Sequence, residues 1–167
     1  MANLRNDAPM PATTHLPVLR SGDRVRGSDA RSWRELTAPL AAGDHAAVRG
    51  LRHLAHSALT LWEVDAKQAE DVVVVLSELA TNALRHTDGP ARIRLRVHED
   101  QLILDVADTS PVMPDFETGP DEDAETPHGF GLTLIVSALA ESLVVTHHPT
   151  RGKTVTATFT IGRTAGA

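Results

Sequence analysis

The spacing of hydrophobic residues changes at Asp88 and Gly89, and this change limits the fold more than any other feature of the chain. Before it, apolar residues recur with the period of an amphipathic helix, about 3.6 residues. From Ala91 to His98, apolar residues alternate with basic ones, which is the period of about two residues typical of a half-buried strand. The chain therefore combines helices and strands, and the outer face of this strand is basic.

The same patterns predict two helices, a hairpin, a long loop, a third helix and a final hairpin. The helix that ends near Arg85 contains four β-branched residues, Val72 to Val75, which a helix tolerates poorly, but its flanks are helix-forming. Asp44 is the expected N-cap of the first helix. The expected ranges are a short strand at 32–36, helices at 45–61 and 66–85, strands at 91–98 and 102–106, a helix at 129–140, and strands at 142–147 and 154–161.

A length of 167 residues is typical of one domain. Residues 1–30 are rich in proline and glycine and are expected to form a flexible leader, with one short strand around 17–19, before a domain at 31–163 and a tail at 164–167. The absence of cysteine excludes disulfides and thiolate metal sites. No signal peptide or membrane span is expected, so the prediction is a soluble, cytoplasmic protein. A net charge of -6 argues against non-specific binding of nucleic acid.

Three polar side chains of different chemistry recur at a spacing of four residues in the second helix. Glu78, Asn82 and His86 bring a carboxylate, an amide and an imidazole to one helical face. The neighbouring face is apolar, so this polar stripe borders the core. The pattern predicts the wall of a pocket, although His86 is more simply a structural hydrogen-bond donor near the end of the helix.

Residues 109–128 differ from the rest of the chain, with four prolines, six acidic residues and no lysine or arginine. A loop of this length without secondary structure is uncommon inside a compact domain and is more often functional. We expect it to be a mobile lid.

Four motifs in this order resemble the ATP-binding domain shared by gyrase, Hsp90 chaperones, histidine kinases and MutL, called GHKL. The resemblance covers residues 44–161 and rests on SELATNALRHT as the N box, DVADTS as the first glycine box, HGFGLTLI as the second, and the threonine in RGKTVTATF. It implies an α+β fold, a two-layer sandwich of a mixed, mainly antiparallel sheet covered on one face by about three helices, with an ATP lid.

The resemblance also implies roles for individual residues. Glu78 takes the position of the general base and Asn82 that of the Mg²⁺ ligand, while Asp108 takes the position that accepts the adenine amine and Thr154 the place beside it. The expected nucleotide contacts are Asn82, His86, Asp108, Ser110, Gly129, Phe130, Gly131, Leu132 and Thr154. Two departures are that Ser110 and Val112 replace glycines of the first box and that Phe130 stands where relatives often carry a basic residue.

Within this group the chain is most similar to the stand-alone anti-sigma factor serine/threonine kinases of actinobacterial type, which carry E-L-x-x-N-A-x-x-H followed by D-x-S. The resemblance implies an enzyme that uses Mg-ATP to phosphorylate an antagonist protein and that sequesters a sigma factor. Its expected partners are the sigma factor, the anti-anti-sigma antagonist and, since related switches commonly work as dimers, a second copy of itself. Neither nucleic acid nor membrane is an expected partner.

Simpler interpretations stay open beside this one. The chain is alternatively a catalytically weak or inactive ATP-binding module that acts by surface contact, or a detached catalytic domain of the histidine-kinase type. A simpler interpretation of Asp108 by itself is that it begins a turn. The run Gly152-Lys153-Thr154 mimics the end of a P-loop, but a strand follows it instead of a helix, so a P-loop is rejected. The histidines lack carboxylates at ligand spacing, so a histidine metal site is not expected.

Overall fold

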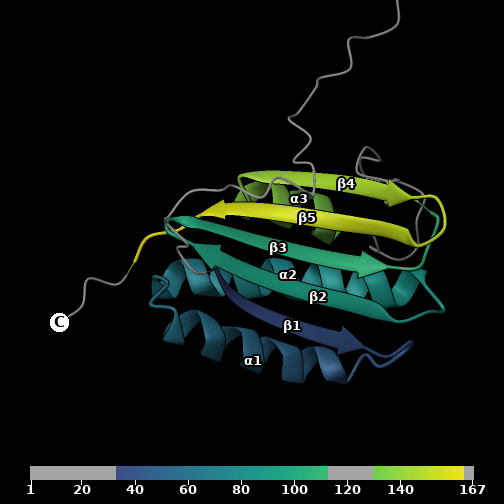
Figure 1. Ribbon diagram of the computed structural model, residues 1–167, viewed down its shortest axis with the longest axis horizontal. Helices are drawn as coiled ribbons and strands as arrows, with labels where there is room; N and C mark the ends of the chain where they lie inside the picture. Colours follow the sequence, from purple (N-terminus) through teal and green to yellow (C-terminus); the bar gives the residue numbers. More distant parts are fainter. Residues whose placement is uncertain (1–32, 113–129, 164–167) are drawn as a thin grey trace, which may run out of the picture. The chain divides into compact units, whose positions relative to one another are not determined.

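A computed structural model describes residues 33–112 and 130–163 of the chain. The elements follow one another in the predicted order (Figure 1). They are β1 (Arg34–Leu40), α1 (Ala47–Leu61), α2 (Ala66–His86), β2 (Ala91–His98), β3 (Gln101–Asp108), α3 (Phe130–Leu139), β4 (Ser142–His148) and β5 (Gly152–Thr160). The expected leader, most of the expected lid and Gly129 lie outside the described residues.

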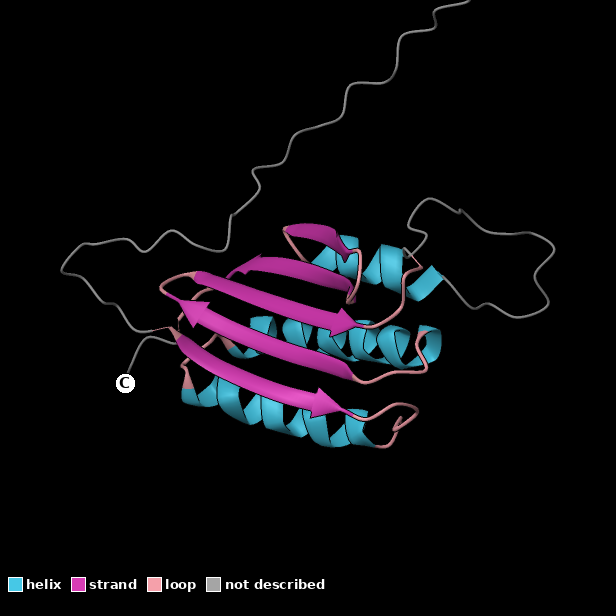
Figure 2. Cartoon of the chain, turned by 45° about the vertical axis from the view of Figure 1, so that its right-hand side comes forward, coloured by secondary structure: helices cyan, strands magenta, loops and turns pink. Residues whose placement is uncertain are grey.

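The five strands form one sheet in the order β1-β2-β3-β5-β4, and all four pairings are antiparallel. The expectation of a mixed sheet was therefore wrong in this respect, because each strand of the described chain pairs with an oppositely directed neighbour. The three helices cover one face of this sheet, as Figures 1 and 2 both show. The α+β two-layer sandwich is thus confirmed, with α2 packed between α1 and α3.

Side chains that alternate along the strands build the core against the helices. Strand β2 has the predicted half-buried pattern, with its apolar residues buried and its basic residues turned to the other face. The buried core includes Ile93, Leu95, Leu104, Val106, Val155, Ala157 and Phe159 from the sheet. Three of the four consecutive valines of α2 are also buried, namely Val72, Val73 and Val75. Their burial outweighs the low helix propensity of β-branched residues, because tertiary packing routinely overrides propensity.

An aspartate accepts backbone N–H groups near the start of each long helix, but only Asp65 is an N-cap, because the N-cap of α1 is Ala46 and not the expected Asp44. The Asp65 side chain accepts from Lys67 N and Gln68 N at 3.0 and 3.3 Å, and Asp44 Oδ1 accepts from Ala47 N at 3.0 Å. Helix α1 nevertheless begins at Ala47, two residues later than expected. None of the helices in the described ranges is long and apolar enough to cross a membrane.

The main boundary error concerns β1. This strand was expected near 32–36 but extends to Leu40, because it pairs with β2 along its whole length, from Arg34 opposite Val97 to Leu40 opposite Ala91. Pro39 is tolerated there because β1 is an edge strand of the sheet.

Candidate functional site

A buried carboxylate ends β3. Asp108 is 4% exposed, and its Oδ1 accepts from Ser110 N at 2.8 Å and from Lys153 Nζ at 2.9 Å. The first bond closes a turn directly after the strand, and the Ser110 hydroxyl then accepts from Val112 N at 3.2 Å. Asp108 therefore does both things that the sequence predicted as alternatives. It begins a turn, and its carboxylate is buried as the family motif predicts. Ser110 is itself buried, and its backbone fixes the orientation of Asp108.

Lys153 is the partner of this carboxylate and lies directly opposite it in the β3–β5 register. Both side chains are only 2% exposed. A buried lysine is rare, and a buried charge requires an opposite charge beside it. Sequence reasoning missed Lys153 because it considered the residue only within a P-loop pattern. The available signal was the alternation of β5, where Val155, Ala157 and Phe159 face the core and Lys153 falls in the same series.

Two glycines allow the neighbouring chain segments to approach Asp108 closely. Gly152 has a φ of +90°, and a Cβ there would lie 2.1 Å from the carbonyl oxygen of Asp108. A Cβ on Gly89 would lie 2.1 Å from Thr109 Oγ1. The positive φ and the backbone contact restrict position 152 to glycine, whereas a Cβ at position 89 would meet only the Thr109 side chain, so the start of β5 packs tightly against the end of β3.

Hydrogen bonds of threonine hydroxyl groups hold the C-terminal end of α2 close to the end of β3 that carries Asp108. Thr87, directly after α2, and Thr109, directly after β3, share a hydrogen bond of 2.7 Å between their Oγ1 atoms. Thr87 Oγ1 also accepts from Gly89 N at 3.1 Å. The end of α2 that carries the predicted polar stripe therefore lies at the Asp108 end of the sheet.

Glu78, Asn82 and His86 all lie on α2, as predicted. Glu78 and Asn82 are half-buried at the edge of its apolar face, beside the buried Leu79 and Ala83, whereas His86 is exposed. The structure gives these three side chains no hydrogen bond to another residue within 33–112 or 135–163. No interaction with that part of the chain competes with a ligand for the Glu78 carboxylate or the Asn82 amide.

The N-terminal end of α3 is directed toward the same end of the sheet. This helix packs on α2 and β4, and it ends at Leu139, close to the start of β4 at Ser142. Because β4 runs toward the Asp108 end, α3 begins on the Asp108 side. Phe130, Gly131 and Leu132 provide the backbone of its first turn, where free N–H groups and the helix dipole favour an anion.

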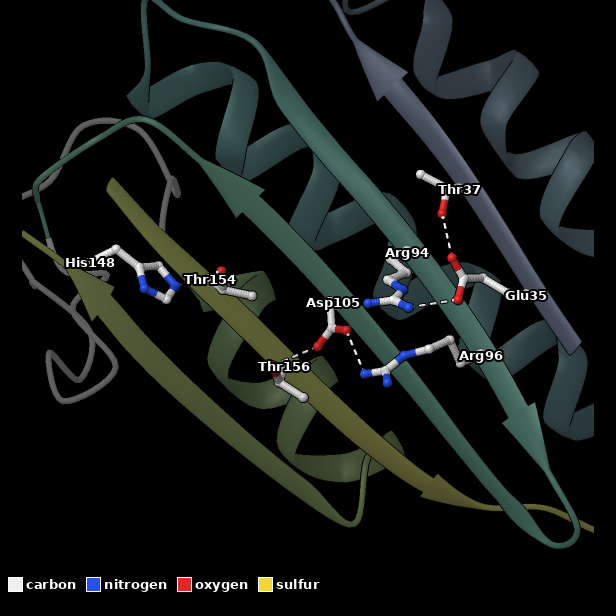
Figure 3. Close-up of polar contacts among 8 residues, drawn as sticks. All are labelled: Glu35, Thr37, Arg94, Arg96, Asp105, His148, Thr154 and Thr156. Carbon is white, nitrogen blue, oxygen red and sulfur yellow. Dashed lines mark hydrogen bonds and ion pairs between the residues drawn. The ribbon is translucent and has the colours of Figure 1, made fainter. Parts of the chain in front are cut away.

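Thr154 does not lie where it was expected. It is one residue beyond Lys153, so its side chain lies on the sheet face that the helices leave open, where its Oγ1 is 3.1 Å from His148 Nε2. Figure 3 shows it there with Asp105 and Thr156, which are joined by a 2.8 Å hydrogen bond. The residue beside Asp108 is Lys153, and this corrects the expected role of Thr154.

Two arginines of β2 form ion pairs with carboxylates on the open face. Arg96 donates to Asp105 at 2.8 Å, and Arg94 donates to Glu35 at 2.7 Å (Figure 3). The hydrogen bond from Arg94 lowers the pKa of the Glu35 carboxyl. These ion pairs are on the opposite side of the sheet from Asp108 and form no part of the candidate site.

The described residues contain no group of three or more histidine, cysteine or acidic side chains able to hold a metal ion. A surface pocket of about 360 Å³ lies at the far end of the sheet, lined by residues that include Gln68, Leu139 and Thr160. The candidate site is therefore the Asp108 corner, where one carboxylate, one amide-bearing helix and one helix N-terminus meet. This arrangement can receive a ligand with an amine at one end and anionic groups at the other.

Comparison with known proteins points to the same chemistry. A family model described as a histidine kinase-like ATPase domain matches residues 41–159. Among 22 matching solved chains, one is the crystal structure of the RsbU and RsbW domains of Rv1364c from Mycobacterium tuberculosis, with a TM-score of 0.56 and 20% identity. The match covers 79% of this chain but 34% of that one, and at this identity it shows a shared fold. No curated protein matches the sequence.

Proposed function

The chain belongs to the histidine kinase-like ATPase domain family, and from this premise we propose that it is an ATP-dependent regulatory protein kinase. Its substrate would be a serine or threonine of an antagonist protein, and it would sequester a sigma factor when that antagonist is unavailable. One observation carries the proposal. The buried, oriented carboxylate of Asp108 shares one end of the sheet with the polar stripe of α2 and the start of α3.

Adenine recognition falls to Asp108 in this proposal. The exocyclic amine of adenine needs an acceptor in a buried pocket, because an unpaired polar group costs about 1 to 3 kcal/mol there. The Asp108 carboxylate is held by Ser110 N and Lys153, so it is oriented before a base arrives. Preorganisation of this kind reduces the entropy lost on binding.

The phosphates would lie between α2 and the start of α3. The backbone N–H groups of the first turn of α3 are suitable donors to phosphate oxygens, and Gly131 permits close approach. Mg²⁺ keeps several waters and needs few protein oxygens when phosphates are present. The single amide oxygen of Asn82 fits that requirement, since the described residues provide no carboxylate cluster for a metal.

Glu78 would act as the general base. It lies one helical turn before Asn82, so both side chains are on the same side of α2. Its carboxylate would accept the proton of the substrate hydroxyl as that oxygen attacks the γ-phosphorus of ATP and ADP leaves. His86, exposed one turn further on, would contact the nucleotide from the rim of the site.

The proposal is tested by incubating the purified chain with Mg-ATP and candidate antagonist proteins from the same organism. We expect acid-stable phosphate on a serine or threonine, and loss of transfer in Glu78→Ala. Glu70→Ala is the matched control, because Glu70 is an exposed glutamate on the same helix. Acid-labile phosphate would instead favour a histidine-kinase-type domain. The absence of transfer to every such antagonist would overturn the kinase proposal.

A second candidate function is an ATP-binding module without catalysis, which regulates its partner by contact alone. The observation that favours it is that Asp108 is held in place by two hydrogen bonds, whereas no residue within 33–112 or 135–163 makes a hydrogen bond that would orient the proposed base Glu78. Calorimetry separates the alternatives. Heat on adding Mg-ATP without transfer to the antagonist would support the module, and no heat at all would indicate a protein that has lost the nucleotide.

A further inference from the structure

Lys153 has no role in the proposal above beyond orienting Asp108. It is a lysine with a 2% exposed side chain at the end of the sheet where the base would lie. If stability were the only requirement, apolar residues at 108 and 153 would serve as well, because a buried ion pair often fails to recover its desolvation cost. The pair therefore calls for a functional explanation.

The described residues use only part of the hydrogen-bonding capacity of the pair. A lysine ammonium has three donors, and one of them goes to Asp108 Oδ1 at 2.9 Å. Both hydrogen bonds that Asp108 accepts from the described residues are to this same oxygen. A carboxylate has about four acceptor positions. Asp108 Oδ2 can thus accept a hydrogen bond from a ligand, and the neighbouring Lys153 Nζ can donate one to the same ligand.

We propose that Asp108 and Lys153 read the base edge together, with Asp108 accepting from the 6-amino group of adenine and Lys153 Nζ donating to ring nitrogen N1. This inference rests on the proposed binding of ATP. Adenine presents a donor, the amine, next to an acceptor, N1. An acceptor next to a donor is the complementary pattern, and the register that pairs Asp108 with Lys153 supplies it.

This role makes Lys153 a specificity-determining residue. A ligand acceptor in a buried site gains more from a charged donor than from a neutral one. Loss of the N1 acceptor would also leave part of the ammonium without a partner when the site is closed by the base. Discrimination at N1 should therefore depend on residue 153, whereas discrimination at the amine should depend on Asp108.

The test is calorimetric titration of the full chain with three magnesium-bound nucleotides. They are ATP, 1-deaza-ATP, in which CH replaces N1, and purine riboside triphosphate, in which hydrogen replaces the amine. We expect the unsubstituted protein to bind each analogue about tenfold more weakly than ATP, a loss typical of one hydrogen bond. In Lys153→Met, which keeps most of the length of the side chain without its charge, ATP and 1-deaza-ATP should bind about equally, while the loss for the purine analogue persists.

Lys67→Met is the matched control, because Lys67 is an 81% exposed lysine on α2, and it should retain both discriminations. Equal affinity of the unsubstituted protein for ATP and 1-deaza-ATP would overturn the inference without any variant, even if Lys153→Met did not fold. A folded Lys153→Met that weakened all three ligands equally would also overturn it, because that result indicates a structural role. Failure of every nucleotide to bind would overturn ATP binding itself, and the inference with it.

Discussion

Asp108 and Lys153 depend on each other because neither charge reaches water. Removing one partner of a buried pair typically costs about 3 to 5 kcal/mol, since the other charge stays buried without compensation. We predict a loss of about that size in the free energy of unfolding for Lys153→Met, measured by urea denaturation. The free energy of unfolding of a domain is usually about 5 to 15 kcal/mol, so this variant should still fold.

The double variant Asp108→Asn with Lys153→Met is the control for this prediction. It removes both charges, so its loss should be well below the sum of the two single losses, because the second substitution relieves the unpaired charge left by the first. Additive losses would show that the two side chains do not stabilise each other. The 2.9 Å distance and the 2% exposure would then have no energetic consequence.

Glu35 and Arg94 form a pair of the opposite kind, on the open face of the sheet, with side chains 38% and 47% exposed. Exposed pairs contribute about 0.2 to 1 kcal/mol. Since the hydrogen bond from Arg94 lowers the folded-state pKa of Glu35, this contribution is present above the unfolded pKa and is lost as the pH falls through the folded one. We predict that Arg94→Gln loses about 0.5 kcal/mol at neutral pH and almost nothing in strong acid.

Urea denaturation across this pH range would measure the effect. Arg92→Gln is the matched control, because Arg92 lies two residues earlier on the same strand face and has no ion pair with the described residues. Its effect should be small at every pH. An Arg94→Gln loss that did not change between neutral and acidic pH would show that packing of the arginine stem, and not its charge, is what stabilises the protein there.

The difference between Lys153 and Thr154 shows where sequence reasoning fails at the scale of single residues. The motif correctly indicated the segment, but a shift of one residue along a strand moves a side chain to the other face. Asp108 was predicted from its order relative to the glycines, and the structure places it buried at the end of β3. For β5, the expected role of Thr154 followed from the motif, whereas the alternation of Val155, Ala157 and Phe159 places Lys153 on the core face.

At the scale of elements, two glycines should respond oppositely to alanine. Gly152 begins β5 with a φ of +90°, and a Cβ there would meet the backbone carbonyl of Asp108 at 2.1 Å. Gly50 lies within α1 with no atom within 4 Å of such a Cβ. We predict that Gly152→Ala loses about 3 kcal/mol of unfolding free energy through strain, whereas Gly50→Ala gains about 0.5 to 1 kcal/mol through helix propensity.

Thermal and urea unfolding of both variants would measure these changes. The effect of Gly152→Ala should also reach the site, because β5 then cannot pack closely against the end of β3. A Gly152→Ala variant as stable as the original chain would mean that the turn before β5 relaxes without cost. A destabilised Gly50→Ala would contradict the exposed position of that glycine in α1.

The order of helices and strands was predictable because the sequence patterns that indicate a helix or a strand are local. Asp65 caps α2, and the period of its buried residues is helical in spite of the consecutive valines. The length of β1 was not predictable, because its seven residues are fixed by pairing with β2 rather than by their own pattern. The insertion of β5 between β3 and β4 also depends on contacts far apart in the sequence, as does the purely antiparallel sheet.

At the scale of the whole molecule, the site depends on segments that only the fold brings together. The end of α2, the end of β3, the start of β5 and the start of α3 meet at one end of the sheet. A ligand that contacts several of these segments binds the folded chain and not the unfolded one. Such a ligand stabilises the folded state by mass action, by about 2.7 kcal/mol at a hundredfold excess over its Kd.

This linkage gives a prediction that separates binding from catalysis. Mg-ATP should raise the free energy of unfolding of the chain by about 2 to 3 kcal/mol at such an excess. Glu78→Ala should keep this stabilisation while losing transfer, because a general base acts on the hydroxyl of the protein substrate and not on the bound nucleotide. Asn82→Ala should lose the part of the ligand stabilisation that requires Mg²⁺, because the Asn82 amide is the proposed protein ligand of the ion.

Thermal unfolding with ATP, with and without Mg²⁺, measures both variants, and Glu70→Ala again serves as the control on the exposed face of α2. If Glu78→Ala lost as much ligand stabilisation as Asn82→Ala, Glu78 would be a binding residue and the proposed division of roles along α2 would be wrong. If Mg²⁺ made no difference to any variant, Asn82 would have no metal to hold. The half-buried positions of both side chains beside the core then would reflect packing at the edge of the helix layer alone.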